Sequence, residues 1–174
     1  MNINNNRIYL IGYMGSGKTT IGQKLAKKLD FQFIDIDCFI ESRQRKTINE
    51  IFFEKGEDAF RLMEHNALEE VSLFENVIIS TGGGTPCFYN NMELMNKTGF
   101  TIYLKTSPEE LNKRLRINKN KRPLLREKKP EEMLAFVAEN LKKRDYYYNQ
   151  TQLIFDTQQM SVNEIVDALI LHLP

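Results

Sequence analysis

The sequence predicts a three-layer α/β domain in which helices cover both faces of a parallel β-sheet. Five short runs rich in β-branched and aromatic residues have the continuous apolar character of strands that are buried on both faces. Helical patterns separate these runs, and such alternation is typical of α/β domains. We expect the strands at residues 8–11, 31–34, 77–79, 101–104 and 153–155.

Three stretches carry apolar residues at helical spacing. Residues 21–29 follow the first strand, residues 60–71 precede the third, and residues 162–169 close the chain. Spacings of three and four residues place the apolar side chains on one face of a helix, where they can pack against a sheet.

Length and composition fit one domain, residues 1–174, with an ordinary core, since 41% of the residues are apolar. The 24 basic and 23 acidic residues leave a net charge of +1, which argues against a nucleic-acid partner. No apolar run approaches the ~20 residues that span a bilayer, and the first residues lack the character of a targeting peptide. Cys38 and Cys87 have no metal-binding spacing. We expect a cytoplasmic protein with free thiols and no membrane partner.

The strongest motif is Gly-Tyr-Met-Gly-Ser-Gly-Lys-Thr at residues 12–19, which matches the P-loop pattern GxxxxGK[ST] between a strand and a helix. Its glycines allow backbone N–H groups to point at phosphate oxygens, and the helix N-terminus adds partial positive charge. Lys18 is placed to reach the β- and γ-phosphates of a nucleotide, and the Thr19 hydroxyl to ligate Mg²⁺.

Two carboxylates, Asp35 and Asp37, follow the second strand. Residues i and i+2 of a strand point to the same face, so both side chains are expected to face the crevice at the carboxyl ends of the strands. Mg²⁺ needs few protein carboxylates, and one suffices. The other can then accept a proton or a hydrogen bond from an acceptor hydroxyl. An ordinary acidic turn is the alternative, which the neighbouring P-loop disfavours.

After the third strand the chain has three consecutive glycines, Gly82, Gly83 and Gly84, where a motor ATPase would be expected to have an acidic residue. Glycines cost backbone entropy, and close approach of the main chain to a ligand is a plausible reason for them.

Arg61 and Glu64 stand at i and i+3, so the carboxylate can hold the guanidinium. Taken alone, such an arginine is more often part of a solvated helix face.

Half of the 16 residues from Arg114 to Lys129 are basic, and Pro123 and Pro130 interrupt any long helix there. This segment is either a solvated surface loop or a mobile basic flap over an anionic ligand.

These motifs, in their order along the chain, resemble those of the shikimate kinase family. The similarity extends from Ile8 to about Leu169. The resemblance implies a P-loop NTPase fold like that of nucleoside monophosphate kinases, with a five-stranded parallel sheet in the order 2-3-1-4-5. It further implies a mobile lid at about residues 114–127 and a substrate-binding region at about residues 35–64. The expected activity is the Mg²⁺-dependent transfer of phosphate from ATP to shikimate, giving shikimate 3-phosphate for aromatic amino acid biosynthesis, by a monomer. The matched segments are the P-loop, Asp35–Asp37, GExxFRxxE at 56–64, the glycine turn, RPLL at 122–125 and R-x-x-x-Y at 144–148.

The resemblance also assigns roles to matched positions. Lys18, Asp37 and Arg122 take catalytic roles, and Thr19 and Asp35 are associated with Mg²⁺. The shikimate hydroxyls are contacted by Asp37, the shikimate carboxylate is clamped by Arg61 and Arg144, and its ring packs against Gly82, Gly83 and Gly84. Contacts with ATP are expected from Gly15, Ser16, Gly17, Lys18, Thr19, Thr20, Arg122 and, in the adenine loop, Gln158.

Three points stay open at this level. A further lid arginine is either Arg114 or Arg116. Asp37 is either a general base or only orients the hydroxyl. Many relatives have a proline in the segment that corresponds to residues 145–148, which makes the geometry around Arg144 harder to predict than that around Arg61.

Other functions fit the sequence less well. A gluconate kinase or a nucleoside monophosphate kinase would share the fold, but the two arginines favour a carboxylate substrate. A regulatory GTPase would need an NKxD motif, and the sequences at 118–121 and 96–99 both lack its aspartate. A nucleic-acid-binding module is disfavoured because the basic run has no interleaved aromatic residues for base stacking.

Overall fold

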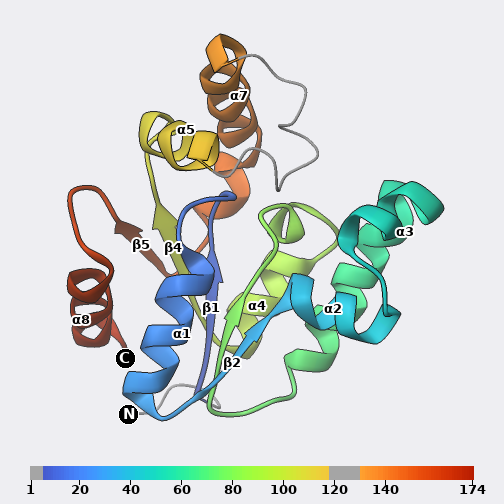
Figure 1. Cartoon of the computed structure of the whole chain (residues 1–174). Helices are drawn as coiled ribbons and strands as arrows, with labels where there is room; N and C mark the ends of the chain where they lie inside the picture. Colours follow the sequence, from blue (N-terminus) through green and yellow to red (C-terminus); the bar gives the residue numbers. More distant parts are fainter. Residues whose placement is uncertain (1–5, 118–129) are drawn as a thin grey trace.

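In the computed structural model, which describes residues 6–117 and 130–174, five parallel strands form one sheet in the order β2-β3-β1-β4-β5 (Figure 1). This is the order that the family resemblance implied, and each strand ends within one residue of its predicted bounds. The central strand β1 is buried along its whole length because it has a strand on each side and helices over both faces. The strands are β1 Arg7–Ile11, β2 Gln32–Asp35, β3 Val77–Ser80, β4 Phe100–Lys105 and β5 Leu153–Asp156.

Helices cover both faces of this sheet, as predicted. The three predicted stripes lie in α1, α3 and α8, while α2, α4, α5 and α7 were not predicted. The helices are α1 Lys18–Leu29, α2 Ile36–Gln44, α3 Ile48–Val71, α4 Asn91–Thr98, α5 Pro108–Ile117, α7 Pro130–Tyr148 and α8 Val162–His172, and a short 3-10 helix, η2, spans Thr85–Cys87.

The apolar core has two layers, one on each face of the sheet. Alternate residues of β1 divide between them: Ile8 and Leu10 join the layer that α1 and α8 cover, whereas Tyr9 and Ile11 join the layer built with α3, α4 and α7. The period of two in a strand thus places helices on both faces. The carboxyl ends of β1, β2 and β3 meet at one edge, where the P-loop, α2 and the glycine turn begin.

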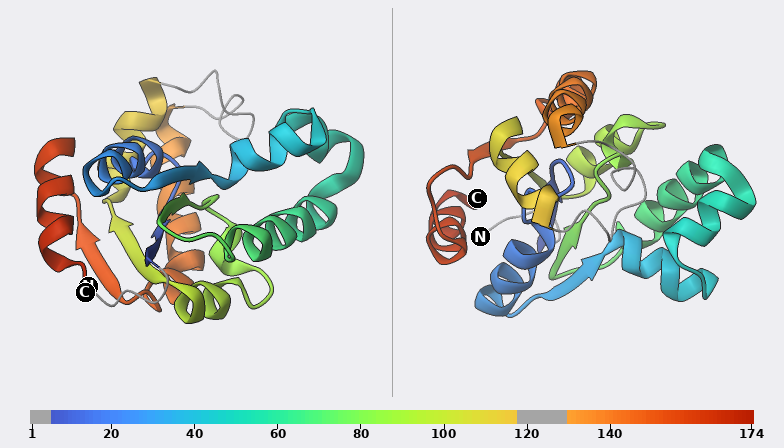
Figure 2. Two further views of the ribbon diagram at one scale, coloured as in Figure 1. Left: turned by 90° about the horizontal axis from the view of Figure 1, so that it is seen from below. Right: turned by 45° about the horizontal axis from the view of Figure 1, so that its top comes forward.

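Helices α2 and α3 pack together beside the edge strand β2, on the opposite side of the molecule from β5 and α8 (Figures 1 and 2). A capping box between Thr47 and Glu50 starts α3. The helix is broken at Gly56, whose φ of 79° and ψ of 175° lie outside the helical region. The second part of α3 therefore takes its own direction, and it carries Arg61 and Glu64.

The predicted substrate-binding region, residues 35–64, comprises the end of β2, α2 and the first two-thirds of α3. Of the predicted lid, residues 114–117 are the last turn of α5, and the remainder lies outside the described residues. Across 6–117 and 130–174, no helix is long and apolar enough to cross a membrane.

Candidate active site

The P-loop connects β1 to α1 and is shaped by its glycines. Gly15 and Gly17 have φ values of 85° and 94°, in the left-handed region that other residues rarely adopt. Lys18 opens α1, and its ammonium group donates hydrogen bonds to the carbonyl oxygens of Gly12 at 2.7 Å and Tyr13 at 3.0 Å. The Ser16 hydroxyl is buried and has no hydrogen-bond partner among the described residues. A buried hydroxyl normally has a partner, and a phosphate oxygen would supply one.

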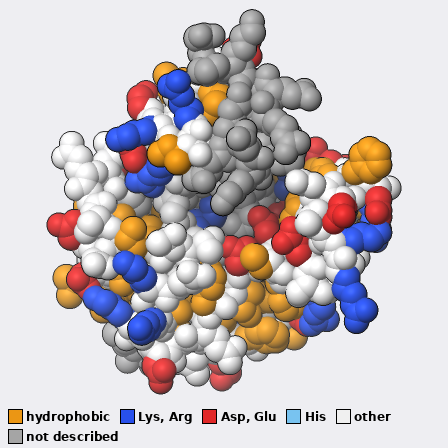
Figure 3. Space-filling model, in the orientation of Figure 1, with side chains coloured by type: hydrophobic (Ala, Val, Ile, Leu, Met, Phe, Trp, Pro, Cys, Tyr) orange, Lys and Arg blue, Asp and Glu red, His pale blue; other side chains and the backbone are white. Residues whose placement is uncertain are grey.

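A cavity of about 620 Å³ extends from the P-loop to the glycine turn that follows β3. On the face of the molecule that Figure 3 shows, acidic side chains gather near the middle, beside α2 and α3. Most predicted nucleotide-binding residues, both aspartates, Gly82 and Gly83 line this cavity together. Its walls are residues 14–21, Asp35, Asp37, residues 80–83, residues 114, 115 and 117, and residues 160, 162 and 165.

Asp35 links the P-loop to α2. Its Oδ1 accepts hydrogen bonds from the backbone N–H groups of Asp37 and Cys38 and so caps α2, while its Oδ2 accepts one from the Thr19 hydroxyl at 2.9 Å. The two aspartates were expected to face the cavity as residues i and i+2 of one strand, and that reason is wrong. The strand ends at Asp35, and Asp37 reaches the cavity from the first turn of α2.

The pair of Thr19 and Asp35 has the chemistry of a Mg²⁺ site, because both side chains offer oxygen ligands and one carboxylate is enough. In the described parts of the chain, no group of three or more His, Cys, Asp or Glu residues could enclose a metal ion. A metal ion held mainly by nucleotide phosphates needs no such cage.

Asp37 lies in an acidic and largely desolvated place. Burial raises its pKa to about 7, and the carboxylates of Glu64 and Asp35 add to the increase, while Lys18 opposes it. A Cβ atom at Gly82 would lie 2.5 Å from Oε1 of Glu64 and 3.0 Å from Oδ1 of Asp37, so both carboxylates converge on this glycine. Asp37 therefore titrates near neutral pH, where a proton acceptor is most effective.

Arg61 is held by two carboxylates of its own helix. Its Nη1 donates a hydrogen bond to Oε2 of Glu64 at 2.6 Å. Its Nε and Nη2 both donate hydrogen bonds to Oε1 of Glu57, at 3.1 and 2.8 Å. Burial alone would lower the pKa of Arg61, but these carboxylates raise it above its ordinary value. The guanidinium also lies 4.3 Å from the ring centre of Phe88, so its plane is fixed by an aromatic neighbour as well. The predicted pairing of Arg61 with Glu64 is confirmed.

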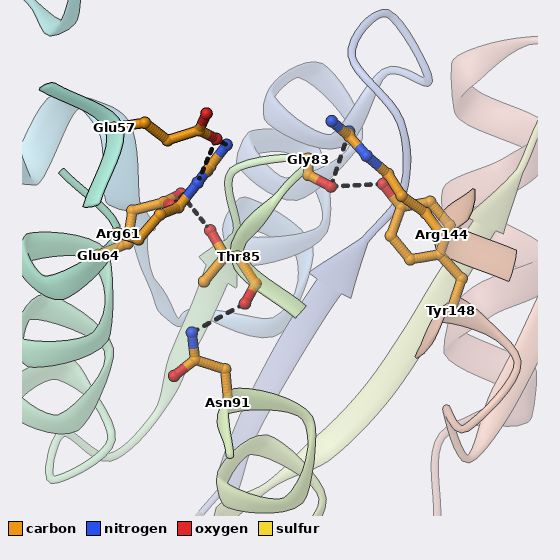
Figure 4. A network of polar contacts seen from close by, with 8 residues as sticks. All are labelled: Glu57, Arg61, Glu64, Gly83, Thr85, Asn91, Arg144 and Tyr148. Carbon is orange, nitrogen blue, oxygen red and sulfur yellow. Dashed lines mark hydrogen bonds and ion pairs between the residues drawn. The ribbon is translucent and has the colours of Figure 1, made fainter. Parts of the chain in front are cut away.

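Arg144, on α7, approaches the glycine turn from the other side (Figure 4). Its Nη1 donates to the carbonyl oxygen of Gly83 at 2.9 Å, and the Tyr148 hydroxyl donates to the same oxygen at 2.5 Å. The guanidinium lies 5.0 Å from the ring centre of Tyr13 in the P-loop. Arg144 therefore has defined partners, although the sequence made its geometry harder to predict than that of Arg61.

The three glycines make room for the charged side chains of the site. Gly82 faces Asp37 and Glu64. A Cβ atom at Gly83 would lie 3.0 Å from Nη1 of Arg144, and one at Gly84 would lie 2.5 Å from Nη1 of Arg61. The sequence suggested that close approach is the reason for three glycines, and in the structure it is the site's own arginines and carboxylates that approach.

Comparison with known proteins identifies the family. The sequence model of the shikimate kinase family matches residues 14–174. The chain is 51% identical to a shikimate kinase of Parabacteroides distasonis over 167 residues, which are 94% of this chain and 96% of the relative. The chain belongs to the shikimate kinase family.

Solved structures of shikimate kinases resemble this fold closely. The crystal structure of the enzyme from Bacteroides thetaiotaomicron has a TM-score of 0.90 at 48% identity and covers 96% of this chain and 98% of that chain. The structure of the shikimate kinase from Acinetobacter baumannii in complex with shikimate has a TM-score of 0.85 at 35% identity. The match covers 95% of this chain and 90% of that chain.

Some residues assigned from the resemblance to shikimate kinases lie away from the cavity wall. Gly84, Arg61 and Arg144 do not line the cavity, but both arginines contact the glycine turn at its end. Gln158 is exposed and does not line the cavity, although its segment does so through other residues. Arg122 lies outside the described residues.

Of the two candidate lid arginines, Arg114 lines the cavity, pairs with Glu110 at 2.8 Å and approaches the carbonyl oxygen of Gly15 at 3.4 Å. Arg116 is exposed and is not part of the wall. The structure thus brings Arg114, and not Arg116, to the P-loop.

Sequence reasoning missed the apolar end of the cavity, where residues 115, 117, 160, 162 and 165 form the wall. The apolar stripe at 162–169 was recognised as a helix face that packs on the sheet, but the helical period does not show that the start of that face reaches the ligand cavity. Thr85 was also missed, because a threonine after a glycine turn has no distinctive pattern.

Proposed function

We propose that this member of the shikimate kinase family transfers the γ-phosphoryl group of ATP to a hydroxyl of shikimate. The observation that carries the proposal is that one cavity joins the P-loop to Asp37, with Arg61 and Arg144 in contact with the glycine turn at its far end. A phosphate donor and an acceptor with one carboxylate and several hydroxyls would then meet beside Asp37.

On the donor side, residues 15–20 surround the phosphates of ATP. Lys18 exchanges its hydrogen bonds with the carbonyl oxygens of Gly12 and Tyr13 for the β- and γ-phosphates, and the Ser16 hydroxyl gains the partner that it lacks. The apolar wall at residues 160, 162 and 165 provides a surface for the adenine ring.

Thr19 and Asp35 would hold Mg²⁺ together with the phosphates, since they offer two oxygen ligands 2.9 Å apart. The metal ion would neutralise charge that develops on the phosphate oxygens.

On the acceptor side, Asp37 accepts a hydrogen bond from the attacking hydroxyl and then its proton, which its pKa of about 7 favours. Arg61 and Arg144 bind the carboxylate, because a planar guanidinium can donate two parallel hydrogen bonds to it. The complex of the Acinetobacter baumannii shikimate kinase with shikimate supports this substrate. Every group in the proposal comes from one chain, so a monomer would suffice.

The test is a coupled assay of ADP release by the purified protein with Mg²⁺ and ATP. Shikimate should give turnover well above that with gluconate or nucleoside monophosphates, and above ATP hydrolysis without acceptor. Identification of shikimate 3-phosphate by mass spectrometry would complete the assignment. A preference for gluconate would overturn the substrate and leave the kinase assignment intact, whereas no turnover with any acceptor would overturn both.

A further inference from the structure

Glu64 has two carboxylate oxygens, and each holds a different partner. Oε2 accepts the hydrogen bond from Nη1 of Arg61 at 2.6 Å, and Oε1 accepts one from the Thr85 hydroxyl at 2.5 Å. Glu64 is 1% exposed and Thr85 is fully buried, so water does not compete for either contact. A buried carboxylate needs such partners to keep its charge.

Thr85 is itself fixed by the elements around it. Its carbonyl oxygen accepts a hydrogen bond from Nδ2 of Asn91 at 2.8 Å. Its backbone N–H donates a hydrogen bond to the carbonyl oxygen of Gly82 at 3.2 Å. Asn91 is fully buried at the start of α4, where its Oδ1 lies 2.7 Å from Nδ1 of His65. Figure 4 shows the resulting series of contacts from Asn91 through Thr85 and Glu64 to Arg61.

The Thr85 hydroxyl restricts how Glu64 engages Arg61. A guanidinium has five N–H donors, two of them on each terminal nitrogen. With Oε1 occupied by Thr85, Glu64 reaches Arg61 through Oε2 alone, and Glu57 takes Nε and one donor of Nη2. One donor on each terminal nitrogen is therefore left for an incoming carboxylate. If Oε1 lost Thr85, Glu64 could turn and bind the guanidinium with both oxygens, which would occupy that edge.

We propose that Thr85 is a positioning residue for acceptor binding, which keeps Glu64 on one nitrogen of Arg61 so that the outer edge of the guanidinium stays open to the substrate carboxylate. Asn91 holds Thr85 in place for this purpose. The inference rests on the proposed function in one respect, namely that Arg61 binds the carboxylate of shikimate.

The test compares Thr85→Val, which removes the hydroxyl at nearly constant shape, with Thr85→Ser, which keeps it. Hydrogen bonds to charged groups are strong enough that Thr85→Val should raise the KM for shikimate about tenfold or more, while the KM for ATP changes less than about twofold. Thr85→Ser should restore most of the affinity. If the valine variant does not fold, Thr85→Ala takes its place with the same expected result.

A matched control is Thr101→Val in β4. Thr101 is fully buried and its hydroxyl also pairs with a side chain, Oδ1 of Asn96 at 2.6 Å, and it lies outside the cavity wall. This variant should lose stability without a change in either KM. An equal rise in the shikimate KM of both variants would mean that Thr85 acts only through stability, and would overturn the inference.

A double variant tests whether Thr85 acts through Arg61. In the Arg61→Lys background, Thr85→Val should add less than about twofold to the shikimate KM, because residues that act through one another are not additive. A full tenfold addition, or an unchanged KM in the single variant, overturns the positioning role. Since both results require a wild type that phosphorylates shikimate, they are distinguishable from a failure of the proposed function.

Discussion

Arg61 and Gly84 approach one another so closely that a methyl group at position 84 would lie 2.5 Å from Nη1 of Arg61 and 2.9 Å from its Cζ. The guanidinium is held by Glu57 and Glu64 and lies close to the ring of Phe88, so it has little freedom to move away. The position of the Arg61 guanidinium therefore depends on the absence of a side chain at position 84.

Gly84→Ala should displace Arg61 and raise the KM for shikimate several-fold, with little effect on the KM for ATP. The backbone at Gly84 has a φ of −92°, which alanine adopts readily, so the cost comes from the contact and not from backbone strain. Steady-state kinetics with each substrate varied in turn, together with a melting temperature, test this. A folded variant with an unchanged shikimate KM would show that Arg61 has room to adjust.

Lys18→Ala should lower kcat at least ~100-fold, because the ammonium group is placed to stabilise charge on the transferred phosphoryl group. Lys27→Ala is the matched control: Lys27 lies on the exposed side of the same helix and does not line the cavity, so its variant should keep normal turnover. Near-normal turnover of a folded Lys18→Ala protein would contradict the P-loop assignment.

The two arginines that contact the glycine turn should respond alike to replacement by lysine. Arg61→Lys and Arg144→Lys each keep the charge but lose the planar fork, so the KM for shikimate should rise ~10-fold or more and the KM for ATP much less. Lys142→Ala, an exposed change on the same helix as Arg144, should leave both values as they are. If Arg144→Lys affected ATP as strongly as shikimate, Arg144 would belong to the nucleotide side of the cavity.

The sheet could be predicted from sequence because its strands are buried on both faces and therefore read as continuous apolar runs. Helix α7 was harder to predict, because polar and charged residues occupy most positions between Val137 and Tyr148, although these two side chains and Met133 lie on one face of the helix. Helix α2 was missed since Asp35 was interpreted as part of a strand face, whereas its side chain caps the helix. For α2 the missed signal was therefore local, because an aspartate directly before a helix is a common N-cap residue.

The site could be predicted only in the parts that are contiguous in the sequence. The P-loop is contiguous in sequence and its geometry follows from its glycines, so its position could be predicted. The contact between Thr85 and Glu64 joins residues 21 positions apart, and it depends on how η2 packs against α3 and α4. No periodicity in the sequence encodes that packing.

Asp37 makes the free energy of unfolding depend on pH. Its pKa rises from an ordinary value near 3.8 to about 7 in the folded protein, chiefly because of burial and secondarily because of Glu64 and Asp35. The folded protein therefore holds a proton that the unfolded chain releases between these pH values. The contribution of Asp37 to stability is fully present below pH ~4 and is lost as the pH rises through 7.

Asn cannot ionise, so Asp37→Asn should remove this penalty. At pH 8 the variant should be more stable than the wild type by on the order of 2 kcal/mol, less than the full shift implies because the side chain is partly exposed and screened. At pH 5 the gain should be clearly smaller, since the wild-type carboxyl group is then protonated in the folded state and only the unfolded chain still ionises, and below pH ~4 it should vanish. Urea titrations at both pH values, with EDTA and without nucleotide, measure the difference in stability. The control Asp58→Asn, an exposed change on α3, should show no such difference.

The same Asp37→Asn protein should lose most of its kinase activity, so the residue that destabilises the fold at neutral pH is the one proposed to accept the proton. A difference in stability between Asp37→Asn and the wild type that is the same at pH 5 and pH 8 would mean that the carboxyl group is solvated in the free protein and titrates normally.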